Sequence, residues 1–317
     1  MNNRRSFIIG IKSTNLLSKE KKFLKKYKPW GVILFSRNIK NIKQTLKLTN
    51  SIRKIFNDKK YPILIDQEGG RVNRLKNIIS FDNLTSELFG KKYIKNFREF
   101  KFYYKLFVDK TSYLLRSIGV NINTVPVLDL RVKGSSNIIG DRSFSKNPKI
   151  VSKIGDYCVQ YFSENKIGTV IKHIPGHGRA KVDSHHFTPL VNKDQNFLIK
   201  NDFKCFKNKK TFFAMTAHII FNKIDHKNTV THSKKMIKII RDKIGFKNLL
   251  ISDDISMKSL KGNIKENTIR TFNSGCNLVL HCNANYKEMQ VIAKNSPLIS
   301  KFIKKNNIKS SFFINLP

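Results

Sequence analysis

Residues 148–178 read PKIVSKIGDYCVQYFSENKIGTVIKHIPGHG, and the pattern changes in the middle of this stretch. Apolar residues recur at helical spacing over 148–165, and Gly168 follows shortly after, as glycines do where helices end. Residues 168–173 form a short run rich in Val and Ile, which is typical of a strand in a covered parallel sheet. The stretch therefore predicts a helix, a buried strand and a polar turn at the strand's carboxyl end.

The same alternation of strand and helix extends along the whole chain. Eight short apolar runs are predicted strands: Ser6–Ile11, Gly31–Phe35, Pro62–Asp66, Val120–Pro126, Gly168–His173, Phe212–His218, Asn248–Asp253 and Cys276–His281. Amphipathic segments between them predict helices, with a final helix near 286–303. Eight such units predict an α/β fold, a single-domain (β/α)8 TIM barrel over residues 1–317. The alternative is an open doubly wound sheet, but no GxGxxG opens a helix after the first strand.

The charge of the chain is extreme. Lys and Arg number 62 against 21 Asp and Glu, a formal net charge of +41. Such an excess favours a nucleic-acid or anionic-membrane partner. The lysines, however, are spread along the whole length, Asn and Ile are abundant too, and no nucleic-acid-binding motif is present. We therefore interpret the charge as drift towards AT-rich codons and expect no specific nucleic acid. A basic nucleic-acid-binding protein remains an alternative, which a salt-dependent gel shift tests.

The cysteines and the N-terminus indicate the compartment. The four cysteines show no CxxC spacing, which is typical of reduced thiols in a cytosolic protein. The apolar run of residues 7–11 is too short for a signal-peptide core, and no run is long enough to span a bilayer. We expect a cytoplasmic monomer with no membrane span.

Polar clusters follow several predicted strands, and a barrel brings all these strand ends to one face. His173 and His177 are four residues apart, but Pro175 and Gly176 between them exclude the helical pairing of a zinc site, so no metal is predicted. Proton transfer fits better. In Asp183-Ser184-His185 a carboxylate precedes an imidazole by two residues and can fix its tautomer. Taken alone, this tripeptide is more typical of a solvated surface loop.

Eight motifs together resemble bacterial β-N-acetylhexosaminidases of glycoside hydrolase family three, the NagZ type of peptidoglycan recycling. In family order they are GVILFSRN (31–38), LIDQEGGRVNRL (64–75), NTVPVLDL (123–130), GDRSF (140–144), KHIPGHG (172–178), DSHHFTP (183–189), MTAHI (215–219) and ISDDISM (251–257). The likeness covers nearly the whole chain, and KHxPGHG followed by DSH is its most specific part.

The resemblance implies an enzyme without a cofactor that removes terminal N-acetylglucosamine from muropeptides such as GlcNAc-1,6-anhydroMurNAc. It implies a retaining mechanism with Asp253 as the nucleophile, His185 as the acid/base and Asp183 orienting His185. The sugar-binding residues it implies are Asp66, Arg74, Arg142, Lys172 and His173. A phosphorylase of the same family is an alternative, because a histidine acid/base repels phosphate less than a carboxylate does. A decayed barrel that only binds its ligand is a further one, which the intact catalytic residues disfavour.

Neighbouring residues have simpler interpretations. Asp254 is expected to cap a helix or pair with a cation, and His177 to shape its loop. Glu68 and Arg71 are expected to brace the turn formed by the EGGR motif. His186 is expected to be exposed, with a share in proton transfer left open.

Overall fold

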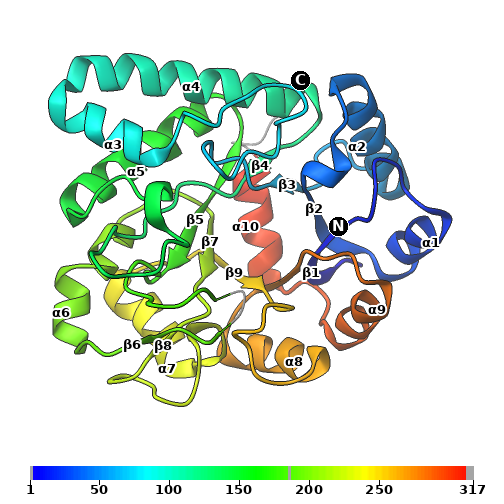
Figure 1. The fold of residues 1–317 in the computed structure, drawn as a ribbon. Coiled ribbons are helices and arrows are strands. Elements are labelled where there is room, and N and C mark those ends of the chain that lie inside the picture. The colour runs from blue at the N-terminus through cyan, green and yellow to red at the C-terminus, as the bar shows by residue number, and fades with distance from the viewer. Residues whose placement is uncertain (1–2, 185–186, 312–317) are drawn as a thin grey trace.

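The computed structural model describes residues 3–184 and 187–311, with side chains up to Asn306. Eight parallel strands form a closed barrel, and β1 pairs with β10 to complete it (Figure 1). The barrel strands are β1 (Arg5–Gly10), β2 (Pro29–Leu34), β3 (Ile63–Ile65), β4 (Ile122–Asn123), β5 (Gly168–Ile174), β7 (Phe213–Thr216), β9 (Leu249–Asp254) and β10 (Leu278–His281). Each of these strands overlaps one of the eight predicted strands, and the predicted TIM barrel is confirmed.

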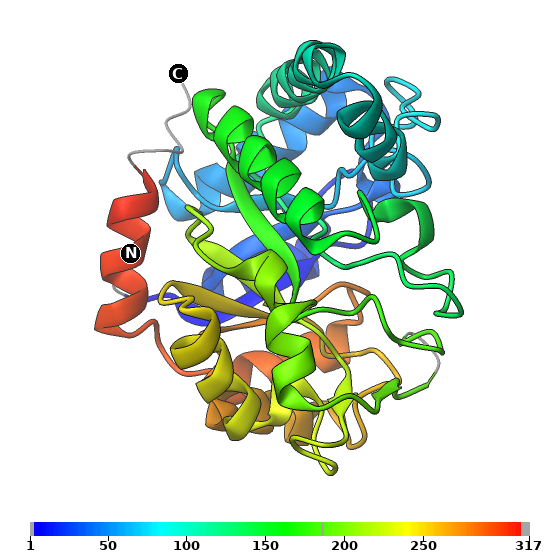
Figure 2. The ribbon, with the colours of Figure 1, turned by 90° about the vertical axis from the view of Figure 1, so that its left-hand side faces the viewer.

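Helices surround the barrel, apart from α10, which lies across one end of it (Figures 1 and 2). They are α1 (Ser18–Tyr27), α2 (Ile42–Phe56), α3 (Ser86–Lys95), α4 (Phe97–Ser117), α5 (Pro148–Glu164), α6 (Gln195–Lys200), α7 (Lys234–Ile239), α8 (Ile264–Ser274), α9 (Tyr286–Asn295) and α10 (Lys301–Ser311). Local signals fix many of their ends. The side chain of Asn147 caps α5 by accepting from the backbone N–H of Lys149, and Pro148 occupies the first helical position, where its missing N–H costs nothing.

The prediction of one final helix over 286–303 is wrong. α9 ends at Asn295 and α10 begins at Lys301, with Pro297 between them. Proline lacks an N–H and disfavours helical backbone in the residue before it, so the helix stops there. The carbonyl of Pro297 instead accepts a hydrogen bond from the N–H of Ser6 at 2.8 Å, which holds the break beside β1.

The break lets α10 close one end of the barrel. Ile299 and Ile303 join the apolar cluster that fills the barrel interior, together with Trp30 and Phe213. A second, larger cluster lies between the strands and the helices. Figure 2 shows α10 at the side of the barrel opposite the long loops after β5. The interior is therefore a packed core, and the carboxyl ends of the strands remain accessible from the other side.

A small parallel sheet was not predicted. β6 (Leu190–Val191) pairs with β8 (Ile220–Phe221), so the segment after β5 is joined to the segment after β7. Two-residue strands have no sequence periodicity that could announce them. Among the described residues, none of the helices combines the length and apolar character needed to cross a bilayer.

Candidate active site

A cavity of about 230 Å³ lies at the carboxyl ends of the barrel strands. Its lining residues are Asp66, Glu68, Arg71, Val72, Arg74, Ile138, Ile139, Arg142, Lys172, His173, His177, Ser184, Met215, Asp253, Met257, Leu280 and Cys282. All five predicted sugar-binding residues and the predicted nucleophile are in this set. Of the predicted Asp-Ser-His unit, Ser184 lines the cavity and Asp183 precedes it in the chain. His185 and His186 lie outside the described residues.

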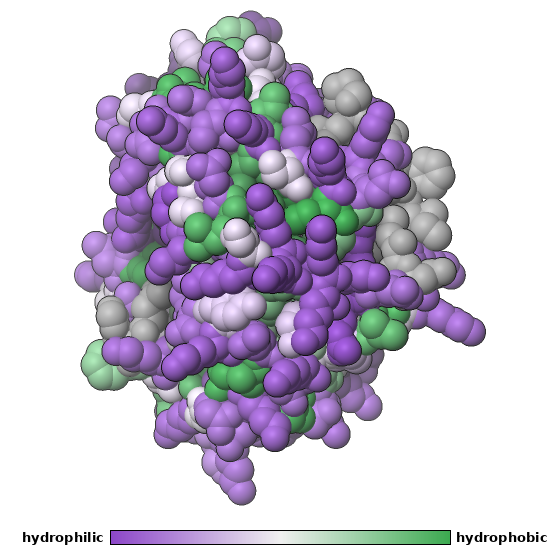
Figure 3. Space-filling model, turned by 90° about the vertical axis from the view of Figure 1, so that its right-hand side faces the viewer, coloured by the Kyte–Doolittle hydropathy of each residue, from purple (hydrophilic) through white to green (hydrophobic). Residues whose placement is uncertain are grey.

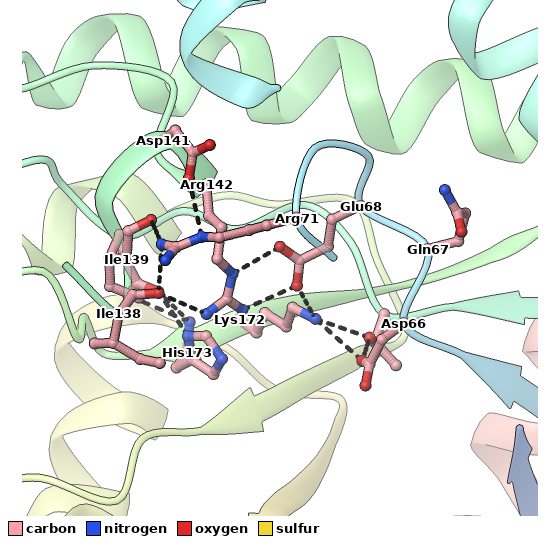
Figure 4. Close-up of polar contacts among 12 residues, drawn as sticks. Asp66, Gln67, Glu68, Arg71, Ile138, Ile139, Asp141, Arg142, Lys172 and His173 are labelled. Carbon is pink, nitrogen blue, oxygen red and sulfur yellow. Dashed lines mark hydrogen bonds and ion pairs between the residues drawn. The ribbon is translucent and has the colours of Figure 1, made fainter. Parts of the chain in front are cut away.

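Lys172, near the end of β5, is the centre of a buried charge network (Figure 4). Its Nζ donates to Oδ1 of Asp66 at 3.1 Å and to Oγ1 of Thr124 at 3.0 Å, and lies 2.6 Å from Oε1 of Glu68. The side chains of Lys172 and Glu68 are each only 3 % exposed. One ammonium thus holds two carboxylates that follow β3.

Arg142 completes the network from the segment after β4. Its guanidinium donates to both carboxylate oxygens of Glu68, at 2.8 and 2.9 Å, and to the carbonyl of Ile138 at 3.1 Å. Bidentate pairing of this kind fixes orientation as well as charge. From the sequence, Glu68 is expected only to brace its own turn. In the structure Glu68 lines the cavity and links Arg142 to Lys172, residues 30 positions apart.

The network keeps both carboxylates ionised. Burial on its own would raise the pKa of Glu68, but Arg142 and Lys172 more than offset it and lower the pKa to about 2. Burial likewise opposes ionisation of Asp66, yet the charges of Lys172 and Arg74 hold its pKa well below the usual range. Arg74 approaches Asp66 at 3.5 Å and lies over the ring of Phe35. This wall of the cavity is therefore made of fixed, compensated charges.

Arg71 braces the loop of residues 137–141 above the cavity, whereas the prediction gave it the turn of its own EGGR motif (Figure 4). Its guanidinium donates to the carbonyls of Asn137, Ile138 and Ile139 at 2.5 to 3.0 Å, and pairs with Asp141 at 3.0 Å. Ile138 and Ile139 line the cavity, so Arg71 positions an apolar edge next to the charged wall.

Asp129 organises two histidines and was missed by the sequence analysis. Its buried carboxylate lies 2.6 Å from Nδ1 of His173 and accepts the backbone N–H of His177 at 2.6 Å. A ring that donates Nδ1–H to Asp129 presents Nε2 to the cavity. Burial opposes ionisation of Asp129, but the neighbouring His173 lowers its pKa overall. The available signal was its place in the motif NTVPVLDL, three residues after the end of a predicted strand.

His177 links this buried pair to the segment that carries Asp183. Its Nε2 lies 3.0 Å from Oγ of Ser184, and burial together with the charge of His173 lowers its pKa to about 4. The ring is therefore neutral at pH 7. His177 shapes its loop, as predicted, through both its backbone and its side chain.

Asp253, the second-last residue of β9, lies on the other side of the cavity from the charged wall. Its Oδ1 accepts the backbone N–H of Asp254 at 2.8 Å. Burial disfavours its charge, but His173 and His218 outweigh this effect and the pKa is lowered. Asp254 has a different task, because its Oδ1 accepts from the N–H and the hydroxyl of Ser256 and caps the turn after β9. Of the two adjacent aspartates, only Asp253 lines the cavity.

His218 lies two residues after β7, and the sequence pointed to it only as part of the motif MTAHI. Its Nε2 lies 3.1 Å from the carbonyl of Asp254, and its Nδ1 lies 2.7 Å from Oγ1 of Thr231. An Nε2–H donated to that carbonyl leaves Nδ1 to accept from the hydroxyl, so the bonds define a neutral tautomer. His218 therefore fixes the backbone next to Asp253.

Comparison with known proteins places these residues in a family. The model of the glycosyl hydrolase family 3 N terminal domain matches residues 8–307. A beta-hexosaminidase of Hydrogenovibrio crunogenus is 32% identical over 289 residues, covering 87% of this chain and 78% of that protein. One from Actinobacillus pleuropneumoniae is 31% identical over 297 residues, covering 90% and 83%. The crystal structure of NagZ from Neisseria gonorrhoeae in complex with N-trifluoroacetyl-D-glucosamine superposes with a TM-score of 0.86 at 26% identity, covering 97% of this chain and 90% of that one.

Proposed function

The chain belongs to glycosyl hydrolase family 3 as a β-N-acetylhexosaminidase of the NagZ type, and from this premise we propose that it is a retaining exo-β-N-acetylglucosaminidase acting on muropeptide fragments. The proposed substrate is GlcNAc-1,6-anhydroMurNAc, with or without its peptide, and the proposed role is peptidoglycan recycling, with its links to cell division and shape. The proposal places the enzyme in the cytoplasm as a monomer that needs no cofactor.

One observation carries the proposal: an ionised carboxylate, Asp253, lines a small cavity opposite a wall of compensated charges. The volume of about 230 Å³ is below the roughly 300–1,000 Å³ of pockets that hold drug-sized ligands. A cavity of this size suits one sugar ring, so the enzyme removes a single terminal residue. The solved structure of the Neisseria gonorrhoeae protein with a glucosamine derivative supports this choice of sugar.

The wall groups suit recognition of hydroxyls and an acetamido group. Asp66 is already held by Lys172 and Arg74, so it stays charged while accepting hydrogen bonds from sugar hydroxyls. Arg74, Lys172 and Arg142 supply N–H donors, and Nε2 of His173 offers a further polar contact. Because these groups are oriented by one another before the sugar enters, little ordering remains to oppose binding.

The proposed reaction has two steps with one covalent intermediate. A carboxylate oxygen of Asp253 bonds to the anomeric carbon as the glycosidic C–O bond breaks, and His185 gives its proton to the departing oxygen. His185 then takes a proton from water as the water oxygen attacks the same carbon and releases Asp253. Two inversions retain the β configuration. Asp183 orients the imidazole and stabilises its charged form.

A second hollow suits the acidic part of a muropeptide. It has a volume of about 530 Å³, lies beside residues 137–140, and its charged lining residues are Glu87, Lys91, Arg131, Lys133 and Lys146. Arg131 and Lys91 both pair with Glu87, which leaves the hollow with a net positive wall. Carboxylates of a peptide attached to the departing sugar would meet attractive charge there.

The test is turnover of p-nitrophenyl β-N-acetylglucosaminide with and without phosphate, with NMR observation of the first-formed product. We expect phosphate-independent release of p-nitrophenol and β-N-acetylglucosamine as the initial anomer. An initial α anomer contradicts the retaining mechanism. Phosphate-dependent release with a sugar 1-phosphate product identifies a phosphorylase instead.

Purified GlcNAc-1,6-anhydroMurNAc, with and without a tripeptide, tests the substrate class. We expect a higher kcat/KM with the peptide in the wild type and loss of that advantage in Lys133→Glu/Lys146→Glu. The double variant keeps the wild-type rate on the nitrophenyl substrate, which has no acidic group to place in the hollow.

A further inference from the structure

The hairpin formed by α3 and α4 exposes an unusual number of apolar side chains. Fifteen large apolar side chains are exposed in the described part of the chain, and six of them lie between residues 94 and 113. These six are Ile94, Phe97, Phe102, Tyr103, Leu106 and Tyr113. Single exposed apolar residues are ordinary on protein surfaces, but a contiguous group indicates a docking surface.

Three of them form a stripe along α4. Phe102, Leu106 and Tyr113 are 66%, 56% and 58% exposed, and their spacing of four and seven residues puts them on one helical face. The opposite face of α4 is buried through Phe100, Tyr104 and Phe107 among others. A surface helix ordinarily has one apolar stripe directed at the core. α4 has a second stripe, directed away from it.

Cations border this outer stripe. Lys101, Lys105 and Arg98 lie on one side along the helix and Lys110 on the other, and Arg116 follows one turn after Tyr113. Residues 86–117 contain eight Lys and Arg against three Asp and Glu, a local net charge of +5. All three acids pair with a lysine of the hairpin: Glu87 with Lys91 at 3.2 Å, Glu99 with Lys92 at 3.6 Å and Asp109 with Lys105 at 2.9 Å.

We propose that the outer face of α4, with the adjoining end of α3, docks on an anionic lipid surface. The stripe enters the headgroup region, where aromatic and aliphatic side chains leave water, and the bordering Lys and Arg side chains contact lipid phosphates. The long stems of the lysines let their charges reach the phosphates while the stripe is immersed. This inference is independent of the proposed substrate and mechanism.

The position of the hairpin is compatible with turnover on a surface. In Figure 1 the hairpin lies along the upper edge of the molecule, and in Figure 2 it lies along one flank of the barrel. The cavity opens at the carboxyl ends of the strands, not on this flank. Docking through α4 therefore leaves the mouth of the barrel uncovered.

Charge and side-chain type favour a membrane over other partners. A second copy of the chain would bring two surfaces of +5 together, and like charges across an interface oppose association. Proteins bind single-stranded nucleic acid through aromatic rings on which the bases stack. Leu106, in the centre of the group, and Ile94, at its edge, have no aromatic ring for a base to stack on. Anionic lipid matches both the apolar stripe and its cationic border.

A neighbouring flank provides a matched control. Figure 3 shows that the side with α1 and α2 is mainly hydrophilic, with scattered hydrophobic patches. On α1 the side chains of Lys21, Lys22 and Lys25 are exposed. This flank has positive charge without an apolar stripe along a helix, so it separates the effect of general charge from that of the stripe.

The experiment is flotation of the full chain with phosphatidylglycerol vesicles and with phosphatidylcholine vesicles. We expect binding to the anionic vesicles only, and a loss of roughly tenfold or more in Phe102→Ser/Leu106→Ser/Tyr113→Ser. The control Lys21→Ser/Lys22→Ser/Lys25→Ser should bind within about twofold of the wild type. Release of p-nitrophenol at the wild-type rate shows that each variant is folded.

Three outcomes overturn the proposal. The first is no binding of the wild type to anionic vesicles. The second is equal binding by the stripe variant, which assigns the effect to overall charge. In the third, the stripe variant still binds vesicles but no longer binds a single-stranded RNA homopolymer. That result would identify this face as a nucleic-acid site.

Discussion

The charged wall and the described residues of the segment 175–189 border the same cavity but are built differently. The wall joins Asp66, Glu68, Arg142 and Lys172 in one buried network on and beside barrel strands. The segment leaves the barrel after β5 and leads to β6, which belongs to the small sheet outside the barrel. The wall is thus held by several barrel strands, whereas the described residues of the segment lie outside the strands of the barrel. The proposed binding groups lie on the former and the proposed proton-transfer unit on the latter.

The first half of the segment is nevertheless firmly positioned. Gly178 lies against the backbone of Leu130 so closely that any side chain would collide with its carbonyl. Arg179 pairs with Asp202 at 2.7 Å, and the carbonyl of Ala180 accepts the N–H of Ser136. The segment is therefore anchored up to Ala180, and Ser184 is tied to His177. Substitutions in the wall should therefore impair sugar binding, and substitutions in the segment should impair proton transfer.

The largest effect is expected for the strand-borne nucleophile. Asp253→Asn should lower kcat by on the order of 10⁶-fold, as loss of a covalent nucleophile does, while the fold and sugar binding persist. A fluorinated sugar substrate should label Asp253, which peptide mass spectrometry detects. Asp254→Asn is the matched control, because Asp254 caps a turn. Covalent label on Asp254 or Asp66 would contradict the assignment.

The next largest effect belongs to the segment. His185→Ala should slow cleavage of natural disaccharides by about 10²–10⁴-fold, the usual worth of general acid–base help. The loss should be much smaller with an activated nitrophenyl leaving group, which departs without a proton. His186→Ala is the adjacent control. A larger effect of His186→Ala, or none of His185→Ala on the disaccharide, means that the wrong histidine was assigned.

Disturbing the wall should affect stability and binding together. Lys172→Met leaves Asp66 and Glu68 buried without their shared cation, which should cost about 3–5 kcal/mol in the free energy of unfolding. KM should rise by a similar factor for good and poor leaving groups. Urea unfolding and kinetics with both substrate types measure the two effects.

Lys209 supplies the control for Lys172. It is also buried, but its partner Asp156 is about half exposed and can be solvated when the cation is removed. Lys209→Met should therefore destabilise less and leave KM unchanged. If the two variants lose equal free energy of unfolding, Lys172 contributes no more to stability than the lysine of an ordinary ion pair.

The barrel could be predicted from sequence because each strand carries its own signal. A short apolar run such as residues 248–253 reports burial on both faces, and eight of them with helices between leave few folds. The error at the C-terminal end had a local signal as well. Pro297 lies inside the predicted helix, and its effect on the preceding residue was not taken into account.

The cavity could be predicted only in part. The side chains that line it follow predicted strands, so their meeting at one face follows from barrel closure. Their pairing does not, because Glu68 and Arg142 are 74 positions apart and their contact depends on the stagger of the strands. Asp129 was missed for the same reason, since its two histidine partners belong to β5 and the turn after it. The roles of His185 and Asp183 stay predictions.

A pH effect should reveal how the segment is fastened. Folding lowers the pKa of His177 from 6.5 to about 4, so between these pH values the unfolded chain binds a proton that the folded chain does not. Stability from this group is full above pH 6.5 and is lost as the pH falls towards 4, by on the order of 3 kcal/mol. Unfolding free energies measured by urea between pH 7.5 and 4 should show this slope.

His177→Gln should flatten the slope only in part, because burial also lowers the pKa of His218 and His232, the latter to about 3. Exposed His226→Gln is the control and should leave the slope unchanged. An identical slope in the wild type and in His177→Gln would show that folding does not lower the pKa of His177.

The smallest effect distinguishes orientation from binding within the segment itself. Asp183→Asn keeps the size of the side chain and removes its charge, so His185 should retain its place but lose the group that stabilises its protonated form. We expect a loss of roughly tenfold with disaccharides, well below that of His185→Ala, and a still smaller one with nitrophenyl substrates. The alkaline limb of the kcat/KM profile should move to lower pH, because His185 must be protonated to act as the acid and its pKa falls without the neighbouring carboxylate. Lys181→Ala, in the same segment, should change neither. A rise in KM that is equal for both substrate types, with an unmoved pH profile, would instead place Asp183 with the charged wall as a binding residue, and the division between the two sides of the cavity would be lost.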